Sequence, residues 1–114
     1  MYFGSARSIS IILTLLVMHL GCGLSSEAKS ARHMKRADQY FTEQKYKEAI
    51  IEYKNVLQIE THNSQATRQL AFAYFAIGDL NQAFPYLLKA KDLDADNLEV
   101  RLKLATLYSL GGRP

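Results

Sequence analysis

Three short segments, ADQYF at residues 37–41, AFAYF at residues 71–75 and ATLYS at residues 105–109, carry an alanine followed three residues later by a tyrosine. Successive alanines lie 34 residues apart. The same offset aligns Ser30 with Ser64, Ala49 with Ala83, and Asn63 with Asn97. Matches at one fixed offset indicate an internal repeat, in which each unit buries its apolar face against its neighbours.

Apolar spacing within the repeat predicts helices. From residue 46 the apolar side chains step by three and four, as on one face of a helix: Tyr46, Ala49, Ile50, Tyr53, Val56 and Leu57. Asp96 followed by Glu99 is typical of a helix start, and Pro85 lies near the start of its own helix, where a missing amide costs least. We expect helices at about 30–43, 46–60, 64–77, 80–93 and 97–110.

The 34-residue period with these residue types resembles the tetratricopeptide repeat, a helix-turn-helix unit. This resemblance implies an all-α fold, a right-handed solenoid of antiparallel helix pairs with two repeats and the first helix of a third. The expected boundaries are 30–63 for repeat 1, 64–97 for repeat 2 and 98–114 for a partial repeat 3. Because a complete third repeat needs another helix, we expect a longer repeat protein, a truncated product, or a partner that completes the core.

The resemblance also assigns residues to a repeat core and to a partner-binding groove. The implied core positions are Ala37, Tyr40, Ala49, Tyr53, Ala71, Tyr74, Ala83, Leu87, Ala105 and Tyr108. The implied groove positions are Met34, Phe41, Arg68, Phe72, Phe75 and Leu102. Phe72 and Phe75 near Arg68 are typical interface anchors, with packing between repeats as the alternative.

The first residues have a different composition. Residues 8–24 contain no charged side chain, and the apolar run 9–20 leads into Gly21-Cys22-Gly23. This arrangement resembles a bacterial lipoprotein signal, which implies a signal peptide at 1–21, lipidation of Cys22 and a linker at 22–29. The implied location is the outer membrane, facing the periplasm. A plain secretory signal, giving a secreted or periplasmic protein, and an uncleaved anchor are the alternatives.

Composition limits the chemistry. The 114 residues carry a net charge of +3 and one cysteine, which indicates neither nucleic-acid binding nor a zinc site. Asp92, Asp94 and Asp96 resemble the start of a calcium loop, but Asn97 and Lys103 replace its glycine and glutamate. His33 and His62 lack a titratable neighbour at helical spacing, so both are expected at the surface or in turns. We expect no enzyme activity, metal, cofactor or small-molecule substrate.

These features predict a lipid-anchored scaffold that recruits another protein to an envelope assembly or export system. Residues 49–58 resemble repeat lipoproteins associated with exosortase and exopolysaccharide systems. Two other readings stay open: a pilotin-like lipoprotein that assists a secretin, and the docking part of a longer protein that carries an enzyme domain.

Overall fold

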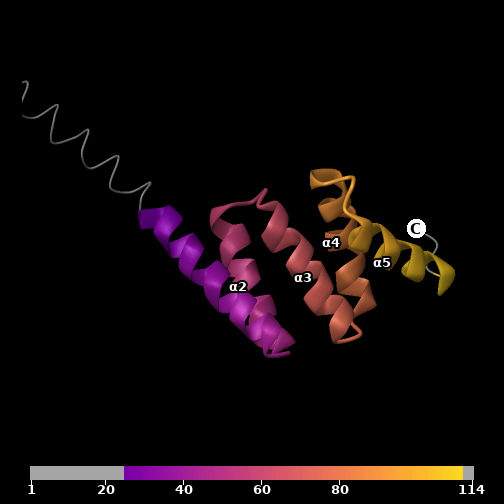
Figure 1. Ribbon diagram of the computed structural model, residues 1–114, viewed down its shortest axis with the longest axis horizontal. Helices are drawn as coiled ribbons and strands as arrows, with labels where there is room; N and C mark the ends of the chain where they lie inside the picture. The colour runs from indigo at the N-terminus through magenta and orange to yellow at the C-terminus, as the bar shows by residue number, and fades with distance from the viewer. Residues whose placement is uncertain (1–24, 112–114) are drawn as a thin grey trace, which may run out of the picture.

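The computed structural model describes residues 25–111, and all regular structure in this range is helical. Residues 25–42 form a helix, here called the N-terminal helix. It is followed by α2 (Tyr46–Ile59), α3 (Ser64–Ala76), α4 (Leu80–Leu93) and α5 (Leu98–Ser109). Consecutive helices pack side by side and alternate in direction (Figure 1). The predicted all-α fold of stacked helix pairs is confirmed.

The N-terminal helix reaches further upstream than expected. Residues 25–29, predicted as part of a linker, are helical. The reason lies in local propensity, because Glu27, Ala28 and Lys29 are good helix formers and nothing between residues 25 and 30 is a glycine or proline. The helix thus extends to within three residues of Cys22, which itself lies outside the described residues.

Equivalent asparagines start the first helices of repeats 2 and 3. The Asn63 side chain accepts a hydrogen bond from the Ala66 amide at 2.8 Å, and the Asn97 side chain accepts one from the Val100 amide at 3.1 Å. The cap of α5 is therefore Asn97, and the prediction of Asp96 was wrong. A cap must reach the amide three residues later, and the extended backbone of Asn97 allows this.

The turns inside the two complete repeats share a backbone shape. Gln44 has a φ of 61° and Gly78, 34 residues later, has a φ of 77°. This left-handed conformation favours glycine, so Gln44 holds a more costly version of the same turn. In α4, Pro85 is the sixth residue, at the start of the second turn, and the helix continues past it.

The core lies between the helices of each pair and is centred on α3. The buried positions with the repeat's small or bulky side chains are Ala37, Ala49, Tyr53, Ala71, Tyr74, Ala83 and Leu87. Tyr40 is partly buried and packs against them. Because the small residues have no exposed surface, the helices of each pair approach closely along them.

The third repeat departs from the predicted core. Ala105 is exposed and Tyr108 is 44% exposed, whereas the equivalent Ala71 and Tyr74 are buried. Within residues 25–111 no helix follows α5 to cover this side. The side of α5 that is buried is instead the one with Val100, Leu104 and Leu107, which packs on α4.

Candidate protein-interaction face

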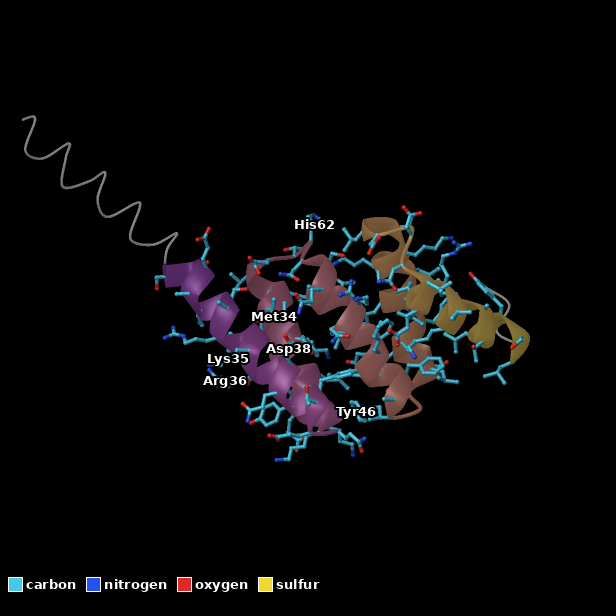
Figure 2. The ribbon with its side chains drawn as sticks, viewed as in Figure 1. Met34, Lys35, Arg36, Asp38, Tyr46 and His62 are labelled. Carbon is cyan, nitrogen blue, oxygen red and sulfur yellow. The ribbon has the colours of Figure 1, made fainter. Side chains whose placement is uncertain are left out.

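The predicted groove residues all lie on the first helix of a pair. Met34 and Phe41 are on the N-terminal helix, Leu102 is on α5, and α3 carries Arg68, Phe72 and Phe75. We call the surface that these six residues follow the first-helix face. Met34 lies on the side of the N-terminal helix that faces the other repeats (Figure 2).

These six residues differ widely in exposure. Leu102 is 59% exposed, whereas Phe72 is 7% exposed and belongs to the core. Met34, Phe41, Arg68 and Phe75 are intermediate. Phe72 therefore packs between repeats and is not a free interface anchor, whereas its neighbours remain partly accessible.

Lys103 covers the two aromatic rings of α3. Its ammonium lies 5.0 Å from the centre of the Phe72 ring and 4.7 Å from that of Phe75. It also lies 3.5 Å from a Glu99 carboxylate oxygen on its own helix. These distances suit cation–π attraction, so α5 supplies a side chain where a partner was expected to contact both rings.

Lys103 was not predicted as part of this face, although the sequence holds a signal for it. It comes three residues after Val100 and four before Leu107, both of which are buried. Helical spacing therefore places Lys103 at the edge of the buried stripe of α5. Its long aliphatic stem can lie on apolar surface while its charge reaches outward.

Phe41 belongs more to repeat 1 than to an open groove. Its ring meets the Tyr46 ring edge-on, with centres 5.2 Å apart, and the Tyr53 ring at 6.5 Å. Such edge-to-face pairs are a preferred aromatic geometry. Phe41 thus fixes the turn between the N-terminal helix and α2 and presents only part of its surface.

Asp38 connects three helices. The buried Tyr53 hydroxyl of α2 donates to one carboxylate oxygen at 2.7 Å, and the Gln65 amide of α3 donates to the other at 3.3 Å. Burial raises the pKa of the Tyr53 phenol well above its ordinary value, and the hydrogen bond to Asp38 acts in the same direction. The contact keeps Tyr53 neutral and aligns the first repeat with the second.

His33 has a charged neighbour that sequence spacing did not reveal. Its Nδ1 atom lies 2.6 Å from a Glu52 carboxylate oxygen of α2, and Arg36 approaches the other oxygen at 3.9 Å. The His33 and Glu52 side chains are 16% and 14% exposed. His33 was expected at the surface or in a turn, whereas it is partly buried within the N-terminal helix. Its neighbour Glu52 is on α2, at no helical spacing from it, so the contact depends on how α2 packs. His62 is exposed in a turn (Figure 2).

Two further properties concern the described residues alone. In residues 25–111, no group of three or more histidine, cysteine, aspartate or glutamate side chains is placed to hold a metal ion. None of the helices in this range is both long and apolar enough to cross a membrane. The predicted lipidation residue, Cys22, lies outside this range.

Comparison with protein families matches residues 40–84 to the family described as Tetratricopeptide repeat. The matched range runs from the end of the N-terminal helix through α2 and α3 into α4. It supports the tetratricopeptide assignment of the repeats and indicates a scaffold for protein interactions, because stacked helix pairs offer extended binding surfaces. No curated protein matches the chain.

Proposed function

We propose that this protein is a lipid-anchored scaffold on the periplasmic side of a bacterial outer membrane, where the first-helix face binds a segment of another protein. The observation that carries the binding role is the exposure of Leu102 on α5 together with the partial exposure of Phe75 and Arg68 on α3, the preceding first helix. Apolar side chains around a guanidinium are a common composition of interface centres.

The charges on this face favour a particular ligand chemistry. Among the described residues, no carboxylate lies within salt-bridge distance of Arg68, whereas Lys103 is paired with Glu99. An arginine with this freedom can hold a carboxylate of the partner through two parallel hydrogen bonds. The partner segment is therefore a peptide or helix with apolar side chains and an acidic residue.

Binding can be tested by capture of envelope proteins on the immobilised chain. The test variant carries Arg68→Ala and Leu102→Ala, which remove the free cation and the exposed leucine. The control variant carries Lys47→Ala and Ile51→Ala on the exposed side of α2, where Ile51 is 60% exposed. We expect capture to fall at least about tenfold in the test variant alone, with helical circular dichroism unchanged in both. Equal capture by the two variants contradicts the proposed face.

The anchor rests on Cys22, placed directly after the apolar run 9–20. Acyl chains on that cysteine would supply about 0.8 kcal/mol per buried methylene, enough in combination to hold the chain at a bilayer. Cys22→Ser should move the protein from the detergent phase to the aqueous phase in Triton partitioning. An unchanged distribution argues for plain secretion or an uncleaved helix.

We further propose that the scaffold serves an exopolysaccharide system of the exosortase-associated kind. The support is that residues 49–58 resemble repeat lipoproteins associated with such systems. A pilotin-like role in secretin assembly is the competing assignment. Capture separates them, because a secretin subunit among the bound proteins favours the pilotin-like role and polysaccharide export proteins favour the other.

A further inference from the structure

The N-terminal helix carries a row of cations on its outer side. The row, called here the basic stripe, consists of Lys29, Arg32, Lys35 and Arg36, and all four are exposed. At 100° per residue these four positions span about a third of the helix circumference. The opposite side of the same helix holds the buried Ala37 and the partly buried Met34, which pack against the core.

The N-terminal helix carries two acidic residues, and neither is within salt-bridge distance of a cation of the stripe. Glu27 is exposed near the start of the helix, and the two carboxylate oxygens of Asp38 accept hydrogen bonds from α2 and α3. Arg36 is 3.9 Å from Glu52 and its side chain stays 56% exposed. For Lys29, Arg32 and Lys35, no carboxylate of the described residues lies within salt-bridge distance.

Other exposed surfaces mix the two signs. On α2, Glu48 directly follows Lys47 in the sequence and both are exposed, and on α5 the Lys103 ammonium lies 3.5 Å from a Glu99 carboxylate oxygen. A surface with interspersed charges remains soluble without a strong local field, whereas a row of one sign attracts an extended layer of opposite charge.

The basic stripe is also at one end of the stack. Lys35 and Arg36 lie on the outer side of the N-terminal helix, while Met34 and Asp38 face the other helices (Figure 2). All four cations are exposed, so no helix among residues 25–111 covers the outer side, and Lys29 is seven residues past Cys22. A flat surface can therefore contact all four cations without touching the first-helix face.

We infer that the basic stripe binds the anionic phospholipid headgroups of the membrane that holds the chain. This inference rests on the proposed lipid anchor for its setting. The N-terminal helix then lies on the headgroups, and the repeats stack away from the bilayer with α5 farthest from it. Lysines and arginines near an anionic membrane each add a modest, salt-sensitive attraction, which complements an acyl anchor.

The test uses the full chain carrying Cys22→Ser, so that no acyl chain contributes to binding. Its binding is measured on vesicles of phosphatidylcholine alone and on vesicles of phosphatidylcholine and phosphatidylglycerol in equal parts. The ratio of the two affinities removes any contribution from the apolar run 9–20, which does not distinguish headgroup charge. We expect a clear preference for the anionic vesicles that weakens as salt is added.

Two variants with equal charge loss locate the effect. The stripe variant carries Lys29→Gln, Arg32→Gln and Lys35→Gln, and the control carries Lys47→Gln, Lys91→Gln and Arg101→Gln, all at exposed positions. In the stripe variant, the preference for anionic vesicles should fall roughly fivefold for each cation removed, on the order of 100-fold in total. In the control variant it should fall only a few fold. Equal losses, or no preference in the unsubstituted stripe, overturn the inference.

A parallel measurement on an acidic polysaccharide, polygalacturonate, separates lipid from polymer. If the stripe variant loses binding to the polymer but keeps its preference for anionic vesicles, the inference is overturned. Failure of the anchor is recognised separately, because Triton partitioning of the native chain reports lipidation and does not depend on headgroup charge.

Discussion

The two ends of the repeat stack carry helices of the same repeat position and opposite character. The N-terminal helix buries Ala37 against α2 and turns cations outward. At the other end, α5 leaves Ala105 exposed together with Leu98 and Leu102, and Leu110, directly after α5, is exposed as well. The first end is covered on its apolar side and has a polar outer side, whereas the second end has an apolar side that no helix within residues 25–111 covers. The equivalent alanine becomes core only where a second helix lies against it.

The largest expected difference concerns the repeat tyrosine. Tyr74 is buried and stacks on Tyr86 with ring centres 5.8 Å apart. Tyr108 is half-exposed, and among the described residues its one aromatic contact is the Phe84 ring, which it meets edge-on at 5.9 Å. Tyr74→Ala should lower the free energy of unfolding by about 3–5 kcal/mol. Tyr108→Ala should lower it by about 1 kcal/mol. Urea unfolding followed by circular dichroism measures both, and similar losses would show that α5 is covered in solution.

The contact that joins the N-terminal helix to α2 is tested by Tyr53→Phe. Loss of the hydrogen bond to Asp38 should lower the free energy of unfolding by about 1.5–3 kcal/mol at neutral pH. The helix content of α5 should not change, because α5 lies at the other end of the stack. A variant as stable as the original chain would mean that Gln65 and water satisfy Asp38 equally well.

The raised pKa of Tyr53 predicts that the free energy of unfolding depends on pH. Because the pKa of Tyr53 is raised in the folded state, the unfolded chain loses this proton first as the pH rises above the ordinary value of 10.0. Stability should therefore be fully present below pH 10 and fall above it by about 1.4 kcal/mol per pH unit from this group. Tyr53→Phe removes this contribution to the pH dependence. In urea titrations at matched pH values, the free energy of unfolding of this variant should therefore fall less steeply above pH 10 than that of the unsubstituted chain.

Replacing the equivalent alanines of repeats 1 and 3 by leucine compares how tightly the two ends of the stack are packed. Ala37 is fully buried, so Ala37→Leu should overpack the helix pair and cost about 1–3 kcal/mol of stability. Ala105 is exposed, so Ala105→Leu should change stability by no more than about 0.5 kcal/mol. Thermal unfolding of both proteins measures the difference. An equal cost at both positions would contradict the exposed side of α5.

Effects of at most about 1 kcal/mol are expected at the residues where the two end helices stop. Gln44 has a φ of 61° after the N-terminal helix, and Gly111 has a φ of 94° after α5. Gln44→Gly should therefore stabilise the chain by up to about 1 kcal/mol, and Gly111→Ala should destabilise it by a similar amount. An alanine Cβ at Gly111 meets no atom within 4 Å, so a measured cost there would reflect the backbone conformation and not a clash.

Much of the fold could be read from local sequence patterns. The period in Ala37, Ala71 and Ala105 and the helical spacing of apolar residues predicted five helices, and their ends fall within a residue or two of the expected positions, except at the start of the N-terminal helix. Caps were less predictable, since Asp96 and Asn97 are both good cap residues and the backbone decides between them. The predicted signal peptide and Cys22 lie outside the described residues and stay predictions.

The candidate face was predicted less completely than the fold. Its residues were placed on the right helices, but exposure depends on neighbours that are distant in the sequence. Phe72 is covered because Lys103 of the next repeat extends over it, and His33 meets Glu52 because α2 folds back beside it. Neither contact has a fixed spacing along the chain, so a periodic pattern cannot reveal it.

By itself, the amino-acid sequence determined where the helices form, which side of each is apolar, and that the outer side of the N-terminal helix is cationic. These properties follow from residue type and a period of 3.6, which act over a few neighbouring residues. Only the tertiary structure decided which apolar sides are buried, because burial requires a second helix at the right distance. That is why Ala37 and Ala105, identical by repeat position, lie in the core and at the surface.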